Sequence, residues 1–326
     1  MSKIIVDMMG SDLGCKATLE GVTLFKQKHP DCELVLVGKK EEIGEGTGCR
    51  IIEANDIVPM NAGALQVIRM KESSMYKAIQ AVNEEKADGV VSAGGTGAFL
   101  SGCALILKKI PGITRPALVT QFPTLIEGKK TVLLDCGAST ENTPEELVSF
   151  GLMGKLYAEA ICGAKDPEVY LVANGTEEGK GSVVGKEAYK LMKETKLYNF
   201  KGNIESKEVL NGTADVLVTD GFTGNVLLKT VEGVAKFMGK NLKKIYKSNL
   251  KTKIGYLCVK KEMGGFLKMM DPKQTGGALL CGVNGVAVKA HGNSDGFAFF
   301  RALVLAYELI KANVVEEIEK GVNPGE

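Results

Sequence analysis

The sequence predicts an α/β fold in which helices cover both faces of a mostly parallel sheet, giving three αβα layers. Six apolar runs of strand length end abruptly at glycine or polar residues, and each is followed by a segment with helical periodicity. Apolar residues make up 44% of the 326 residues, which is ample for a buried core. Strands that alternate with helices in this way build a largely parallel sheet with both faces covered.

The six runs give the order of the predicted strands. They cover residues 3–7, 89–92, 131–135, 169–173, 215–219 and 285–289. We call the residues that directly follow each strand its exit. The most informative exit is in segment 215–225, where a strand passes into a helix through polar and glycine residues. Ligands of such sheets bind beyond the carboxyl ends of the strands, so we expect the six exits to form a site along one edge. A single glycine turn would indicate only a turn, and the repetition favours a site.

Charge and cysteine content exclude several classes of protein. The net charge is only +2, and arginine occurs only at Arg50, Arg69, Arg115 and Arg301, so we expect no nucleic-acid partner. The eight cysteines form no CxxC pair, and the first residues read as a strand rather than a secretory leader, which predicts a cytoplasmic protein. With two histidines and no ligand spacing, we expect no metal site.

No linker or low-complexity segment divides the chain, so we expect one domain over residues 1–326. Residues 236–273 contain eleven lysines against Glu262 and Asp271, a net charge of 11 − 2 = +9, with apolar residues interleaved. This pattern predicts a basic amphipathic helical excursion. Lys243, Lys244 and Lys247 are candidates for a surface that docks an acidic protein or an anionic membrane, and an ordinary solvated helix face fits the pattern equally well.

Two side chains near strand exits are candidates for chemistry. Lys180 lies between Gly179 and Gly181 shortly after a predicted strand. The spacing is not that of a Walker A motif, but a lysine there can hold a phosphate or a developing oxyanion. His291 follows the strand at 285–289 and is placed to act as a general acid or to donate a hydrogen bond to a carbonyl, although a buried structural histidine would show the same pattern.

Seven motifs, in order along the chain, together carry a resemblance to one family. They are residues 5–7 with Gly10 and Asp12, residues 71–75, residues 92–94 with 96–98, residues 177–181, residues 215–226, residues 282–285, and residues 289–292 with Ser294. The chain resembles the bacterial phosphate acyltransferases, which transfer a fatty acyl group from acyl carrier protein to inorganic phosphate in phospholipid synthesis.

The resemblance implies a three-layer fold of the isocitrate and isopropylmalate dehydrogenase-like and phosphotransacetylase-like kind. It also implies a cytoplasmic homodimer that uses no cofactor, with room for peripheral contact at the inner face of the membrane. Lys180, Asn225 and His291 are the implied catalytic residues, and transfer is expected to be direct, without an acyl-enzyme. The implied substrate- and phosphate-binding residues are Ser92, Gly94, Thr96, Gly97, Asp220, Gly221, Gly224, Asn284 and Ser294.

Departures from the family pattern leave alternatives open. The family usually has asparagine where this chain has Gly95 and Ala173, so two side-chain amides are missing from strand exits. One alternative is an acyl-CoA-dependent phosphate acyltransferase of the phosphotransacetylase type, and another is a catalytically impaired, membrane-associated scaffold. A metal- and NAD-dependent decarboxylating dehydrogenase would need an arginine cluster, which the four dispersed arginines do not supply.

Overall fold

The computed structural model describes residues 2–323, and a mixed sheet of 11 strands runs through this part of the chain. In chain order the strands are β1 (Lys3–Asp7), β2 (Glu33–Gly38), β3 (Arg50–Glu53), β4 (Gly89–Ser92), β5 (Ala117–Pro123), β6 (Lys130–Leu134), β7 (Glu168–Ala173), β8 (Asn199–Glu205), β9 (Val216–Val218), β10 (Ala278–Cys281) and β11 (Val286–Lys289). All six strands predicted from the sequence are present, and their bounds shift by no more than one residue. The order across the sheet is β3-β2-β1-β4-β11-β10-β5-β6-β9-β7-β8.

The direction of the strands divides the sheet into two halves. Strands β3, β2, β1, β4 and β11 are parallel to one another. Strand β10 is antiparallel to both β11 and β5, and β5 is antiparallel to β6, so the parallel set β6, β9, β7 and β8 runs the opposite way. The expectation that all six exits share one edge is therefore wrong. The exits of β1, β4 and β11 lie at one edge, and those of β6, β7 and β9 lie at the other.

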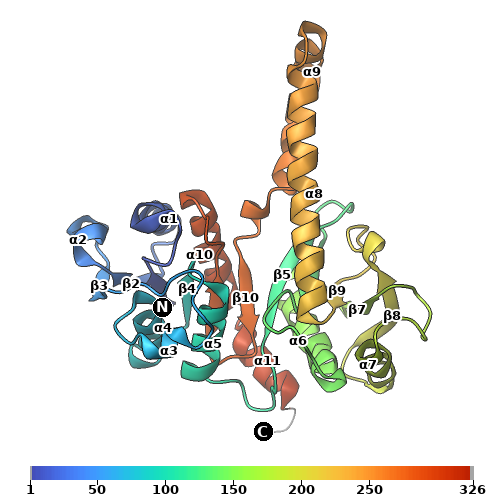
Figure 1. Cartoon of the computed structure of the whole chain (residues 1–326), viewed down its shortest axis with the longest axis horizontal. Helices are drawn as coiled ribbons and strands as arrows, with labels where there is room; N and C mark the ends of the chain where they lie inside the picture. Colours follow the sequence, from blue (N-terminus) through green and yellow to red (C-terminus); the bar gives the residue numbers. More distant parts are fainter. Residues whose placement is uncertain (1, 324–326) are drawn as a thin grey trace.

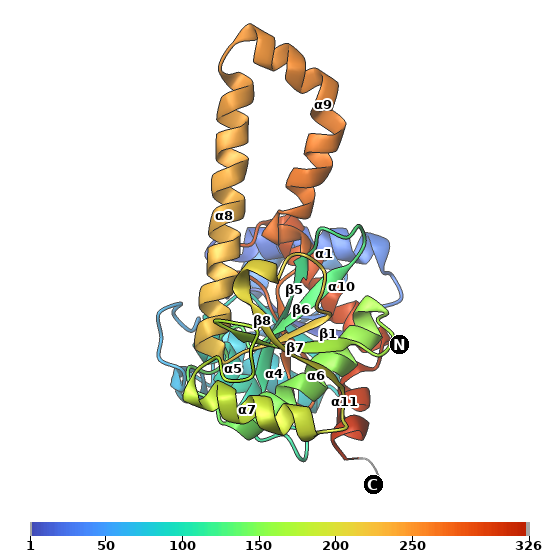
Figure 2. The same ribbon diagram turned by 90° about the vertical axis from the view of Figure 1, so that its right-hand side faces the viewer.

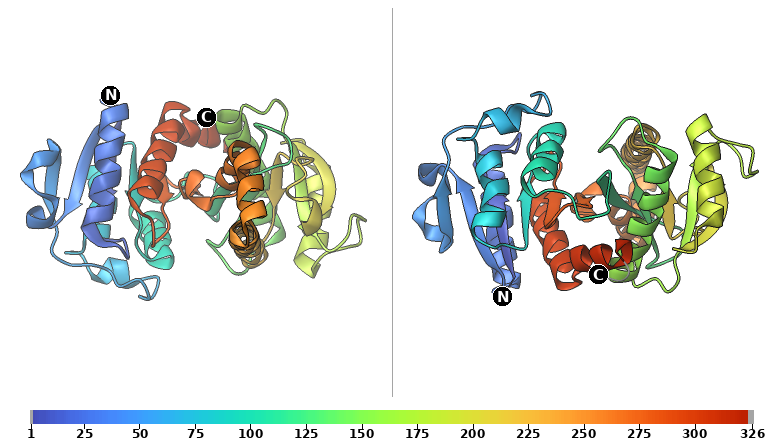
Figure 3. Two further views of the ribbon diagram at one scale, coloured as in Figure 1. Left: turned by 90° about the horizontal axis from the view of Figure 1, so that it is seen from above. Right: turned by 90° about the horizontal axis from the view of Figure 1, so that it is seen from below.

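Helices cover both faces of the sheet, as the sequence predicts (Figure 3). Helices α1, α6, α10 and α11 pack on one face, while α4, α5 and the first turns of α8 pack on the other. The α-helices are α1 (Gly14–Lys28), α2 (Lys40–Ile43), α3 (Gln66–Arg69), α4 (Ser74–Glu84), α5 (Thr96–Ile106), α6 (Pro144–Cys162), α7 (Val183–Glu194), α8 (Gly221–Lys247), α9 (Leu250–Met269), α10 (Gly296–Lys311) and α11 (Val314–Val322). Short 3₁₀ turns are η1 (Glu45–Thr47), η2 (Ser206–Glu208) and η3 (Pro272–Gln274).

The central strands are apolar on both sides because both of their faces are buried. In β1, Ile4 and Val6 belong to one core and Ile5 to the other, and all three side chains have no exposed surface. Alternate residues of a strand point to opposite faces, so continuous apolar runs are what a sheet between two helical layers requires. This burial fixes the positions of the polar residues that follow each strand.

Helices α8 and α9 form a hairpin that extends far beyond the body of the protein (Figures 1 and 2). Residues 236–269 of this helical hairpin lie within the excursion predicted at 236–273. The Asn249 side chain caps α9 by accepting a hydrogen bond of 3.0 Å from the backbone N–H of Thr252. No residue of α9 is buried within the described chain. Capping and the contacts between α8 and α9, such as the Tyr246–Tyr256 ring pair at 5.0 Å, therefore hold this hairpin without a buried core.

None of the helices between residues 2 and 323 combines the length and the apolar character needed to cross a membrane.

Candidate active site

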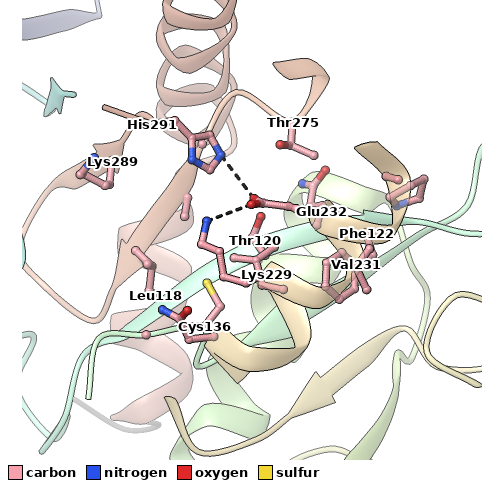
Figure 4. A pocket seen from close by; sticks show the side chains of 18 of the residues that line it. Leu118, Thr120, Phe122, Cys136, Lys229, Val231, Glu232, Thr275, Lys289 and His291 are labelled. Carbon is pink, nitrogen blue, oxygen red and sulfur yellow. Dashed lines mark hydrogen bonds and ion pairs between the residues drawn. The ribbon is translucent and has the colours of Figure 1, made fainter. Parts of the chain in front are cut away.

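A cavity of about 140 Å³ lies on the face of the sheet covered by α5 and α8 (Figure 4). Thr96 at the start of α5, Asn225 on α8 and His291 after β11 all line it. Strand β5 also lines the cavity, from Leu118 to Pro123. Because β5 lies between the two halves of the sheet, the cavity brings together residues that follow strands of opposite direction.

Helix α8 supplies polar side chains along one stripe. Asn225, Lys229 and Glu232 are spaced i, i+4 and i+7, so they face the cavity from successive turns over about 10 Å of helix. Glu232 Oε2 accepts a hydrogen bond of 2.9 Å from Lys229 Nζ. Its other oxygen, Oε1, lies 3.8 Å from His291 Nε2. Dashed lines in Figure 4 mark the contacts of the Glu232 carboxylate with Lys229 and His291. One carboxylate therefore interacts with two basic groups.

The environment of His291 favours the neutral imidazole. Burial lowers the pKa of His291 below its ordinary value, and this outweighs the opposing effect of Glu232. The positive charges of Lys229, Lys289 and Lys236 lower the pKa further. A neutral imidazole can accept a proton at one nitrogen and donate a hydrogen bond from the other. His291 is thus suited to proton transfer at neutral pH.

The N-terminus of α5 offers backbone donors to the same cavity. Gly95 occupies the N-cap position, and no side chain of the described residues caps this helix. The first N–H groups of a helix have no intrahelical acceptor and favour an anion. A Cβ on Gly95 would lie 2.9 Å from the Met60 carbonyl oxygen, so the asparagine usual in the resembled family does not fit this backbone without a shift.

The predicted residues around α5 separate into donors and supports. Thr96 and Gly97 belong to its exposed first turn. Ser92 is buried and donates a hydrogen bond of 2.6 Å to Asp7 Oδ2, while accepting one of 3.1 Å from the Gly94 N–H. The residues at 92–94 therefore hold the turn in place, and those at 96–97 present it to a ligand.

The glycines at the start of α8 allow close packing. A Cβ on Gly221 would lie 1.9 Å from the Ser139 carbonyl oxygen, and one on Gly224 would lie 1.9 Å from that of Asp135. Their N–H groups already have acceptors, Asn142 Oδ1 for Gly221 and the Asp220 carbonyl for Gly224. These glycines bring α8 against the loop after β6, and their N–H groups are not free for phosphate.

Other predicted residues lie away from this cavity. Lys180 and Asp220 line a second cavity of about 480 Å³ at the exits of β7 and β9. Asp220 there caps α8, with Oδ1 2.8 Å from the Thr223 N–H. Ser294 is buried and closes a turn onto the His291 carbonyl. Asn284 precedes β11, at the edge opposite His291, and donates to the Leu107 and Lys109 carbonyls.

Comparison with known proteins shows the family. A family model described as fatty acid synthesis protein matches residues 2–317. The chain belongs to that family. A phosphate acyltransferase of Pseudothermotoga lettingae is 42% identical over 320 residues, covering 98% of this chain and 96% of the relative. Another, of Staphylococcus haemolyticus, is 41% identical over 305 residues, with 93% of each chain covered.

Solved structures support the predicted fold class. A phosphotransacetylase from Streptococcus pyogenes matches with a TM-score of 0.64 at 17% identity, covering 97% of this chain and 94% of that one. A branched-chain phosphotransacylase from Enterococcus faecalis matches with a TM-score of 0.59 at 13% identity, covering 95% and 99%. These likenesses confirm the phosphotransacetylase-like three-layer fold of this family member.

Lys229 and Glu232 were missed by sequence reasoning. Their signal was present, because they continue the stripe of Asn225 at helical spacing. A lysine and a glutamate three residues apart are usually an exposed surface pair, and only the tertiary position of α8, packed on β6 and lining the same cavity as β5, turns them toward a cavity.

Cys136 lines the cavity but is fully enclosed, and burial raises the pKa of its thiol well above the ordinary value, with Asp135 adding to the effect. Burial also raises the pKa of Cys281 to about 12. Neither forms a thiolate readily. Within the described residues, no group of three His, Cys, Asp or Glu side chains is arranged to hold a metal ion.

Proposed function

We propose that this family member transfers a fatty acyl group from acyl carrier protein to inorganic phosphate, forming an acyl phosphate. The observation that carries the proposal is the composition of the cavity, which has basic and hydrogen-bonding groups beside an apolar wall. The relatives named phosphate acyltransferase and the family description support the same reaction.

The apolar wall suits an acyl chain. It is formed by Leu118, Phe122, Pro123, Leu210, Leu228, Val231, Ala235, Met269, Met270 and Ala278. Met269 and Met270 come from the end of α9, so the base of the helical hairpin closes one side of the cavity. Flexible methionine side chains adapt to chains of different length.

The basic groups suit the reacting atoms. Phosphate would bind at the N-terminus of α5, and one of its oxygens would form a bond to the thioester carbonyl carbon. The carbon–sulfur bond then breaks. The proton of hydrogenphosphate passes to His291 and from there to the departing thiolate, so the products are acyl phosphate and a free thiol. Asn225 and Lys229 would donate to the carbonyl oxygen as its negative charge develops.

Direct transfer fits the cysteine chemistry. An acyl-enzyme would need a nucleophile with an adjacent base, and the thiol that lines the cavity, Cys136, is held protonated by burial. Phosphate is itself the nucleophile in this mechanism.

Lys180 has a proposed role outside the cavity that holds His291. Its own cavity is open to the exits of β7 and β9, beside Thr219 and the Asp220 cap. We infer that Lys180 attracts the phosphorylated arm of the carrier or the incoming phosphate, and that it does not contact the same atoms as His291. Ala173, which stands where the family usually has asparagine, also lines this second cavity.

The helical hairpin is proposed as the partner surface. Lys243, Lys244 and Lys247 are exposed, and the hairpin also exposes large apolar side chains, including Leu250 (73% exposed) and Leu257 (69% exposed). Acyl carrier protein is acidic, so the lysines would steer it toward the cavity entrance. The exposed apolar residues would pack against a second copy in a homodimer and would also make peripheral contacts with the membrane. The protein itself is proposed to be a single domain located in the cytoplasm.

The decisive test is acyl phosphate formation from purified protein, with acyl carrier protein and CoA thioesters of several chain lengths, in phosphate and in phosphate-free buffer. Phosphate-dependent consumption of carrier thioester is expected. Preference for short acyl-CoA would favour the phosphotransacetylase-type alternative, and no turnover with either donor would favour the impaired scaffold.

A further inference from the structure

Lys289, the last residue of β11, is a buried lysine that the mechanism above does not use. Only 7% of its surface is exposed, and its ammonium donates to the carbonyl of the adjacent Ala290. Across the described residues, no carboxylate oxygen lies within ion-pair distance of it. A buried charge on which the carboxylates of Asp12 and Asp7 act only from beyond ion-pair distance is costly, and an anionic ligand beside it would lower that cost.

The surroundings of Lys289 are polar and preformed. Lys289 is in register with Ser92 of β4, whose hydroxyl donates to Asp7, so the three residues lie side by side at the exits of β11, β4 and β1. Ser74 at the start of α4 is also buried, and its hydroxyl is directed at Asp7, where it lowers the pKa of that carboxyl against the larger effect of burial. Ser92 and Ser74 thus hold the Asp7 carboxyl in place beside Lys289, and the end of β11 is polar and fixed.

The same lysine reaches the candidate active site. It lines the cavity together with His291, as Figure 4 shows, and with Thr96, the first residue of α5. An ammonium and the first N–H groups of a helix, brought to one small space, favour a compact dianion more than a neutral ligand.

We propose that Lys289 is a substrate-binding residue that holds the phosphate acceptor at the N-terminus of α5. This inference rests on the proposed function and adds the cation that pairs with the acceptor's charge. It also distinguishes the roles of the cavity's two lysines: Lys289 binds phosphate, and Lys229, fixed by Glu232, faces the thioester.

A pH dependence follows from the charges that face Lys289. Burial lowers the pKa of Lys289 to about 8, with Asp12 and Asp7 opposing the shift and Lys229 adding to it. His291 is the other titrating group at this end of the cavity, and it is neutral above its lowered pKa. Phosphate binding favours the ammonium, so phosphate affinity is expected to fall as pH rises through about 8.

The test compares the full chain with Lys289→Met, Lys289→Arg and a control, Lys165→Met, which changes an exposed lysine between α6 and β7. Calorimetric titration with inorganic phosphate should show affinity at least on the order of 10-fold weaker for Lys289→Met, the loss of one charge-assisted contact. KM for phosphate should rise equally, while KM for acyl carrier thioester should stay constant. Lys289→Arg should retain binding and lose the fall near pH 8, because arginine stays charged.

Folding can be separated from binding in the same experiment. Replacing an unpaired buried charge with an apolar side chain of similar length should leave the melting temperature of Lys289→Met equal to or above that of the wild type. If Lys289→Met binds phosphate more weakly but melts at the wild-type temperature or above, the weaker binding comes from loss of the lysine and not from misfolding.

The remaining outcomes would contradict either the role of Lys289 or the proposed reaction, and the measurements distinguish these two failures. Unchanged phosphate affinity in Lys289→Met would overturn the inference. A raised KM for carrier thioester alone, with weaker binding of phosphopantetheine, would also overturn it and would place the phosphodiester of the carrier arm at Lys289. Lys289-dependent phosphate binding without acyl phosphate formation would leave the inference standing and refute the proposed function.

Discussion

Glu232 lies between two basic groups, with Oε2 2.9 Å from Lys229 Nζ and Oε1 3.8 Å from His291 Nε2. The lysine contact is a hydrogen bond, whereas the histidine distance is too long for one. Glu232 therefore fixes Lys229 directly and acts on His291 through its charge. The charge raises the pKa of His291 against the larger effect of burial.

Glu232→Gln should lower the pKa of His291, because the substitution removes the negative charge that raises it. The acid limb of the pH profile of kcat/KM should move to lower pH, since His291 must be neutral to accept a proton. The release of Lys229 should also reduce kcat/KM at neutral pH by on the order of 10-fold. Glu317→Gln on α11, which breaks a 3.0 Å pair with Lys320 at the same i, i+3 spacing, is the matched control. An unmoved acid limb would show that His291 is not the proton acceptor.

Asn225→Ala and Lys180→Ala should each reduce kcat/KM by on the order of 10²-fold, as expected when a donor to developing charge or to a substrate anion is lost. Because the two side chains line different cavities, their effects should multiply in the double variant. Steady-state kinetics with acyl carrier thioester measure all three variants, and circular dichroism checks their folding. A double variant no slower than the single variants would mean that both residues serve one contact.

Gly224→Ala should destabilise the protein by roughly 1–3 kcal/mol or more, because the added methyl group would meet the backbone oxygen of Asp135 at 1.9 Å. Gly233→Ala is the matched control on the same helix, where an added Cβ meets nothing within 4 Å. It should stabilise the protein by about 0.5–1 kcal/mol. Urea unfolding measures both changes. Equal stability of the two variants would disprove the packing role of Gly224.

Charge reversal of Lys243, Lys244 and Lys247 should weaken binding of acyl carrier protein or of anionic vesicles, and the wild-type affinities should fall as salt is added. The control reverses Lys186, Lys190 and Lys196, which are exposed on and just after α7, on another part of the surface. Co-sedimentation with vesicles and titration with carrier separate the two partners. Unchanged binding to both would rule out this surface.

The local structure and the side chains available for chemistry follow from the sequence alone. Each predicted strand appears where an apolar run ends in polar residues, and the lysine-rich stretch is helical. Both could be predicted because strand burial and helical spacing depend on the pattern of apolar residues that are close in sequence. The motif order also led to the family without any coordinates. His291 and Asn225 were identified at this level, and the structure places both in one cavity.

Which of these residues lie close together in space depends on the tertiary fold. Because antiparallel β10 and β5 lie between the two parallel halves of the sheet, the exits of those halves lie at opposite edges. The spacing of apolar residues in a strand does not indicate the direction in which that strand runs. This arrangement of the sheet places Lys180 and His291 at different cavities, and it brings Lys229 and Glu232 to the cavity of His291. Contacts between residues far apart in sequence depend on how the whole sheet pairs, and that pairing is a property of the folded chain.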